Sequence, residues 1–130
     1  MIYLDSCIVI YLVEEHPLYC SPLEAALQPN EIYCISPLVE MECLVLPIKR
    51  QRHDLIEKFK NFFTTQRRLS MPQAIFHHAA DLRAHHGLKT PDALHLATAR
   101  HHDCSGFWTN DDRLREVAGD MAINVLKVCR

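Results

Sequence analysis

Short apolar runs alternate along the chain with longer stretches in which apolar residues recur every three or four positions. The short runs predict strands at residues 2–4, 32–35, 68–71, 106–109 and 122–126. The longer stretches predict helices at residues 8–15, 23–27, 53–63, 72–86, 92–102 and 112–117, with one more helix after Pro37. Strands that alternate with helices in this way predict an α/β fold around a mostly parallel sheet.

Ser-Pro and Thr-Pro pairs predict where three helices begin. They lie at Ser21-Pro22, Ser36-Pro37 and Thr90-Pro91. Each pair offers a hydroxyl suited to an N-cap, followed by a proline at the first helical position. The helix after Ser36 is expected to end before Pro47, and the helix of residues 72–86 is expected to close at Gly87.

Length and composition indicate one globular domain over residues 1–130. The chain is 48% hydrophobic and 23% charged, and three glycines and seven prolines leave no room for a long flexible linker. No basic region precedes the apolar start, and the apolar run of residues 7–13 is too short to span a bilayer. We therefore expect a cytoplasmic protein without a membrane segment.

Charge is unevenly distributed. The net charge is −2. Residues 49–68 hold seven Lys or Arg against two acids, which gives this segment +5 and leaves −7 for the rest. The basic segment fits a solvated helix face as well as a track for RNA. The six cysteines contain no C-x-x-C pair, so we interpret them as buried reduced thiols.

Carboxylates recur where the carboxyl ends of the predicted strands would meet. Asp5 follows the first strand, and Asp111 follows the strand of residues 106–109. Asp92 lies in the first turn of a helix, and Glu42 lies six residues into another, about 9 Å along the axis. Ligands bind at this edge of open parallel sheets, so we expect the four acids to gather there. A hard divalent cation with oxygen ligands would relieve their repulsion and support phosphodiester hydrolysis.

Each acid also has a plainer explanation. Asp5 could cap a helix, Asp92 could favour a helix dipole, and Asp111 or Asp112 could be an N-cap. Glu42 could face solvent. For each acid taken singly, the plainer explanation is favoured, but together these explanations must also account for a carboxylate recurring at the predicted sheet edge in otherwise apolar segments. Asp5 in particular interrupts a start that is otherwise almost entirely apolar.

Four segments carry a family resemblance, in order along the chain. They read M-I-Y-L-D-S at residues 1–6, S-P-L-V-E-M-E-C-L at 36–44, T-P-D-A-L-H-L-A-T-A at 90–99 and F-W-T-N-D at 107–111. Together they resemble the PIN-domain ribonucleases, in particular the VapC toxins of bacterial and archaeal toxin–antitoxin pairs. In this register the functional acid of the second segment is Glu42 rather than Glu40, and Asp111 completes the T-N-D motif rather than Asp112.

The resemblance implies a three-layer α/β/α PIN fold, dependence on Mg²⁺ or Mn²⁺, an RNA substrate, a cognate antitoxin and a homodimer. The implied catalytic and metal-binding carboxylates are Asp5, Glu42, Asp92 and Asp111. The implied supporting residues are the hydroxyls of Ser6 and Thr109, which would orient carboxylates or a metal-bound water, and the peripheral Asn110 and Asp112. The implied reaction is attack of water on phosphorus, leaving a 5′-phosphate and a 3′-hydroxyl. The antitoxin is expected to bury a basic or apolar surface and to place a positive side chain into the acidic cluster.

Other interpretations stay open beside this one. His95, one turn after Asp92, could face the site or pack in the core, and Arg113 and Arg115 could contact RNA or simply be solvated. The chain could be an inactive PIN-like module that binds RNA or protein, although all four acids are present. A receiver-type phosphoacceptor would need a lysine at a late strand end, and Lys127 lacks that context. Flap-type DNA nucleases carry more acids and longer insertions than 130 residues hold.

Overall fold

Five parallel strands form the sheet at the centre of the molecule. The computed structural model describes residues 1–119 and 122–123. The strands are β1 (Ile2–Leu4), β2 (Tyr33–Ile35), β3 (Arg67–Arg68), β4 (Gly106–Trp108) and β5 (Ala122–Ile123). Their order is β3-β2-β1-β4-β5, and every pairing is parallel. The expected parallel sheet is confirmed.

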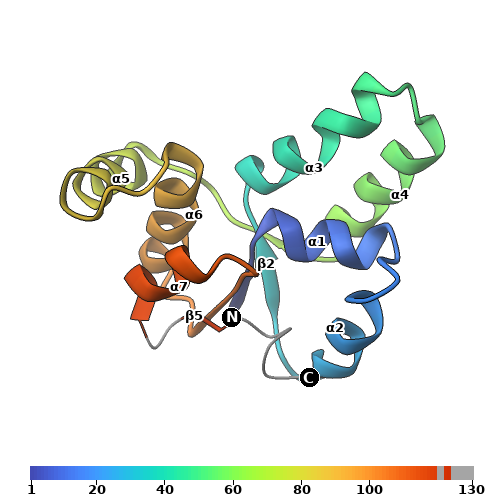
Figure 1. Ribbon diagram of the computed structural model, residues 1–130, viewed down its shortest axis with the longest axis horizontal. Coiled ribbons are helices and arrows are strands. Elements are labelled where there is room, and N and C mark those ends of the chain that lie inside the picture. The colour runs from blue at the N-terminus through green and yellow to red at the C-terminus, as the bar shows by residue number, and fades with distance from the viewer. Residues whose placement is uncertain (120–121, 124–130) are drawn as a thin grey trace.

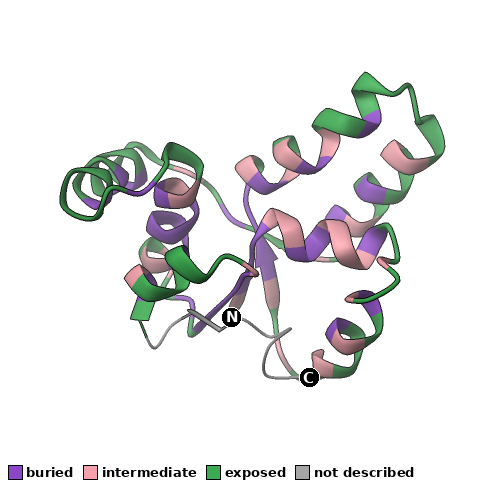
Figure 2. Cartoon of the chain, viewed as in Figure 1, coloured by how far each residue is buried: buried purple, intermediate pink, exposed green. Residues whose placement is uncertain are grey.

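Helices cover both faces of this sheet. They are α1 (Ser6–Val13), α2 (Cys20–Ala26), α3 (Pro37–Lys49), α4 (His53–Thr64), α5 (Gln73–His86), α6 (Thr90–His101) and α7 (Asp112–Ala118). Figure 1 shows α1 to α4 on one side of the sheet and α5 to α7 on the other. The residues that the helices turn toward the sheet are buried (Figure 2). The expected three-layer α/β/α arrangement is therefore observed.

Strand β1 occupies the middle of the sheet because it pairs with both β2 and β4. Tyr3 and Leu4 are almost completely buried as a result. A strand covered on both faces reads as a continuous apolar run, as the start of this chain does. The residue that follows β1 is Asp5, so this carboxylate lies at the centre of the carboxyl edge of the sheet.

Two of the predicted helix signals are confirmed. The hydroxyl of Ser36 accepts a hydrogen bond from the Val39 amide at 3.3 Å and caps α3. Gly87 closes α5 in the left-handed conformation, with φ of 66°. Helix α1 begins at Ser6, two residues earlier than expected, because Asp5 serves as its N-cap.

Two of the predicted caps are wrong. Helix α2 begins at Cys20 with Tyr19 as its N-cap, so Ser21 lies inside it. Helix α6 begins at Thr90, and Lys89 is its N-cap. A proline is tolerated throughout the first turn of a helix, where amides have no intrahelical acceptor. Its position therefore does not identify the cap residue.

Other expected boundaries also differ. Helix α3 continues through Pro47 to Lys49, because this proline removes a single backbone hydrogen bond while its ring is buried in the core. Strand β3 is shorter than expected and begins at Arg67, although the Leu69 amide still donates to the Ile35 carbonyl at 2.8 Å. Of the predicted last strand, residues 124–126 lie outside the described residues, as does Lys127.

The basic residues are exposed and most of the described cysteines are buried. All seven basic residues of segment 49–68 are exposed, and Arg52, Lys58 and Arg68 form ion pairs with acids. The five cysteines in the described part are free thiols, four of them buried, and Cys129 lies outside that part. Among the described helices, none is long and apolar enough to cross a membrane.

Candidate active site

A cleft of about 450 Å³ opens at the carboxyl ends of β1 and β4. Five carboxylates line it: Asp5, Glu42, Asp92, Asp111 and Asp112. The other lining residues are Ser6, Cys7, Tyr11, His95 and Asn110. The acids come from the end of β1, from α3, from α6 and from the β4–α7 connection, so the cleft draws on both helical layers.

Asp5 is fixed at the base of this cleft by three hydrogen bonds. Its amide donates to the Trp108 carbonyl at 3.0 Å and continues the sheet. One carboxylate oxygen accepts from the Ser6 amide at 2.8 Å, and the other accepts from the Thr109 hydroxyl at 2.8 Å. The Thr109 hydroxyl also accepts from the Asp111 amide at 3.0 Å, so it joins the two strand ends that carry these acids. Asp5 is therefore both a helix cap and a buried, oriented carboxylate.

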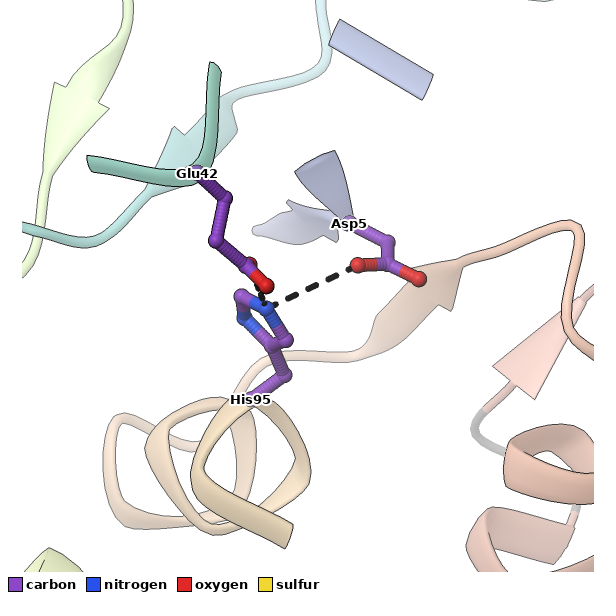
Figure 3. A group of neighbouring side chains, drawn as sticks. All are labelled: Asp5, Glu42 and His95. Carbon is purple, nitrogen blue, oxygen red and sulfur yellow. Dashed lines mark hydrogen bonds and ion pairs between the residues drawn. The ribbon is translucent and has the colours of Figure 1, made fainter. Parts of the chain in front are cut away.

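Glu42 meets a buried histidine from the opposite layer. Its Oε1 accepts a hydrogen bond from His95 Nε2 at 2.5 Å, and His95 is only 1% exposed. The same Nε2 lies 3.7 Å from Asp5 Oδ1. Figure 3 shows the three side chains converging, and their ligand atoms all lie within 4.8 Å of one another. This contact places Glu42 in the cleft, although it comes from the second turn of a helix.

The environment affects two of the carboxylates in opposite directions. Burial opposes ionisation of Glu42, but the hydrogen bond and attraction of His95, together with a hydrogen bond from Ser6, lower its pKa overall. Burial and then the negative charges of Asp111 and Asp5 raise the pKa of Asp92. Negative charge is therefore crowded around Asp92 in a way that a bound cation would relieve.

Asp111 and Asp112 have different surroundings. One oxygen of Asp111 accepts from the amides of Arg113 and Leu114, at 2.9 and 3.2 Å, and caps α7. Asp111 is also close enough to raise the pKa of Asp92. The Asp112 carboxylate lies 3.8 Å from the Arg115 guanidinium. These contacts favour Asp111 as the fourth carboxylate of the site.

The chemistry of the cleft fits a hard divalent cation. Carboxylate oxygens from separate segments converge, and such oxygens are the ligands that Mg²⁺ and Mn²⁺ prefer. The imidazole nitrogen nearest the acids already serves as a hydrogen-bond partner of Glu42. The thiol of Cys7 donates to Asp5 at 3.7 Å, and burial raises its pKa far above the usual range, so it stays a neutral thiol.

The structure brings the predicted site residues together. Seven line the cleft: Asp5, Ser6, Glu42, Asp92, Asn110, Asp111 and Asp112. Thr109 lies behind the cleft, buried, in contact with Asp5. Their roles in metal binding stay predictions. His95, whose place the sequence left open, is at once buried and in contact with Glu42. Arg113 and Arg115 are both exposed, and Arg113 donates to the Gly87 carbonyl at 2.9 Å.

Some residues at the site were not predicted. Tyr11 lines the cleft and accepts from the Asn110 amide group at 3.2 Å. Tyr3 and Ser36 lie behind His95 and are completely buried. One signal was present in the sequence, because a phenol inside a buried strand needs a hydrogen-bond partner. The sequence does not say which residue supplies that partner.

This chain resembles a known protein family in sequence and solved proteins in structure. The sequence profile of the PIN domain matches residues 2–120. The chain belongs to the PIN domain family. No curated protein matches this PIN domain significantly by sequence.

Solved structures resemble this PIN domain over nearly its whole length. A toxin–antitoxin complex from Klebsiella pneumoniae matches with a TM-score of 0.75 and 24% identity, covering 96% of this chain and 98% of that one. VapBC2 from Rickettsia felis, bound to a promoter DNA fragment, matches with a TM-score of 0.77 and 20% identity, covering 95% and 98%. VapC20 from Mycobacterium tuberculosis, a toxin that cleaves the sarcin–ricin loop, matches with 0.74 and 16%, covering 89% and 94%. These likenesses confirm the expected fold.

Proposed function

We propose that this PIN domain is a metal-dependent endoribonuclease, the toxin of a VapBC-type toxin–antitoxin pair. One observation carries the proposal: Asp5, Glu42, Asp92 and Asp111, from four separate segments, line a single open cleft. The solved relatives support it, since one is a toxin that cleaves an RNA loop. Such an enzyme would meet RNA in the cytoplasm and would work as a single domain over residues 1–130.

Each side chain has a definite task in this proposal. The four carboxylates would hold Mg²⁺ or Mn²⁺, with Asp5 oriented by Thr109 and Glu42 oriented by His95. The ion, when bound, supplies Lewis acidity and lowers the pKa of water for attack on phosphorus. The Cys7 thiol remains protonated, so the cleft does not present a thiolate nucleophile. Water is the nucleophile in this proposal, and the products are a 5′-phosphate and a 3′-hydroxyl.

The test is cleavage of a labelled structured RNA, such as tRNA, with Mg²⁺, Mn²⁺ or EDTA. We expect metal-dependent cleavage that EDTA and the Asp5→Asn substitution abolish. Asparagine keeps a capping oxygen for α1 but removes the charge. The matched control is Asp81→Asn on α5, outside the cleft, which should cleave normally. Cleavage that survives Asp5→Asn would place the site elsewhere. RNA binding without cleavage under any metal would indicate an inactive PIN-like binding module instead.

The antitoxin is the proposed partner, and an exposed apolar stripe on α3 supports this. Met41, Val45 and Ile48 are 57%, 54% and 58% exposed, and their spacing puts them on one side of the helix. The buried residues Val39 and Cys43 face the other way. Apolar side chains gathered on a surface helix mark an interaction site. Two solved relatives are complexes of toxin with antitoxin.

A pull-down from the native host tests the partner. We expect a small co-purifying protein that the double substitution Val45→Asp/Ile48→Asp removes. The matched control is Phe76→Asp, which changes an exposed apolar residue of α5 and should keep the partner. Loss of the partner from the control alone would move the interface to α5. We also propose a homodimer, for which light scattering should give twice the mass of 15.0 kDa.

A further inference from the structure

Behind Glu42, buried polar groups form a continuous chain of hydrogen bonds, here called the buried relay. The Val39 amide donates to the Ser36 hydroxyl, which lies 2.7 Å from the Tyr3 hydroxyl. The Tyr3 hydroxyl lies 2.7 Å from His95 Nδ1, and His95 Nε2 contacts Glu42. Ser36 and Tyr3 are 0% exposed and His95 is 1% exposed. The relay thus runs from the start of α3 through the centre of the sheet to the cleft.

Both nitrogens of the His95 ring have a partner in this relay. The ionised Glu42 carboxylate only accepts, so His95 Nε2 donates to it. The other nitrogen, Nδ1, lies against the Tyr3 hydroxyl. That hydroxyl also lies against Ser36, whose oxygen accepts from the Val39 amide. The ring is therefore held at both nitrogens, by Tyr3 on one side and by Glu42 on the other.

We infer that Tyr3 is a positioning residue that acts on the cleft through His95. Its hydroxyl holds the His95 ring at Nδ1 and fixes the ring plane, and the ring in turn aims the Glu42 carboxylate beside Asp5. The step from an aimed Glu42 to tighter cation binding rests on the proposed function. The position of the His95 ring and the aim of Glu42 are independent of that function.

The surroundings of Tyr3 allow the hydroxyl to be removed by itself. The Tyr3 ring stacks on Phe107 with centroids 5.2 Å apart, and Tyr3→Phe keeps that ring. Tyr33 provides a matched control on the neighbouring strand. Its hydroxyl accepts from the Gln28 amide at 2.8 Å and lies outside the relay, so Tyr33→Phe removes an equivalent group without touching His95.

The experiment is nitrogen-15 NMR of the His95 ring, with the carbon-13 resonance of the Glu42 carboxylate followed in the same metal-free samples. We expect wild type to show a hydrogen-bonded Nδ1. Tyr3→Phe should shift both the Nδ1 and the Glu42 resonances, and Tyr33→Phe should shift neither. Mn²⁺ affinity, measured by calorimetry, should fall about tenfold in Tyr3→Phe. A loss of this size is typical when a residue that orients a metal ligand through a hydrogen bond is removed.

Three results would overturn the inference. They are a wild-type Nδ1 without a hydrogen bond, unchanged His95 and Glu42 resonances in Tyr3→Phe, or equal changes in both variants. The wild-type spectrum tests the contact between Tyr3 and His95 even if Tyr3→Phe does not fold. Wild-type protein that binds no Mn²⁺ would count against the proposed function, and the metal-free resonances would still decide whether Tyr3 positions Glu42.

Discussion

At the residue scale, Asp5 shows that a structural and a functional explanation can both hold for one side chain. One carboxylate oxygen caps α1 through the Ser6 amide, and the other accepts from the buried Thr109 hydroxyl behind the cleft. Capping alone would be served as well by serine or asparagine. A buried charge is costly unless it has a further partner, so the cap by itself does not explain an aspartate here.

Asp92 gives a prediction about stability. Its pKa is raised in the folded protein, so its ionised form is disfavoured there, and stability increases as pH falls through that raised pKa. Asp92→Asn should therefore stabilise the metal-free protein at pH 7, by about 1 kcal/mol after screening by solvent. The gain should vanish as pH falls below about 4, the ordinary pKa of an aspartate, because the unfolded side chain is then protonated too. Thermal unfolding across pH measures this.

The control for that series is Asp81→Asn on α5. It removes an exposed carboxylate outside the cleft and should leave the melting temperature nearly unchanged. If instead Asp92→Asn lowered the melting temperature at pH 7, crowding of negative charge would not be the dominant effect of Asp92 on the stability of the fold.

At the scale of elements, the sequence predicted which helices and strands are present better than it predicted the residues at which they begin and end. Strand-end positions located Asp5 and Asp111 because parallel strands share a carboxyl edge. The helices predicted after the caps Ser21 and Thr90 were expected to begin at residues 23 and 92, three and two residues too late, because proline fits anywhere in the first turn. The place of Glu42 in the cleft depends on its contact with a histidine 53 residues away. Contacts of that span are decided by packing and are not readable from local pattern.

Gly87 gives a prediction at this scale. It holds a φ of 66° between α5 and the helix that carries Asp92, and an added Cβ would lie 3.4 Å from the flexible end of Arg113. There is room for the methyl group, so the cost comes from the left-handed backbone. Gly87→Ala should destabilise the protein by about 1 kcal/mol. Gly87→Asn should cost less, since asparagine tolerates this conformation. Denaturant unfolding of both variants gives the comparison, and equal losses would indicate a steric cause.

At the scale of the whole molecule, the cleft joins both helical layers and the sheet. A cation bound there would stabilise the folded chain as a whole, by RT ln(1 + [L]/Kd). Mn²⁺ at about a hundred times its Kd should add about 2.7 kcal/mol to the free energy of unfolding. Thermal unfolding with and without Mn²⁺ should show this rise in wild type, and Asp5→Asn should not show it. A similar rise in both would mean that the ion binds outside the cleft.

The order of the carboxylates along the chain has a consequence for synthesis. They lie at positions 5, 42, 92 and 111, and β1 becomes the middle of the sheet only when β4 pairs with it. A chain that is still emerging from the ribosome at first lacks Asp92, Thr109 and Asp111. Once Asp92 has been made, it still lacks Asp111 and the Thr109 hydroxyl that orients Asp5. The cleft therefore cannot assemble before residue 111 has been made. The nuclease activity proposed for it could not arise on a shorter nascent chain, beside the ribosomal and transfer RNA that surround it during translation.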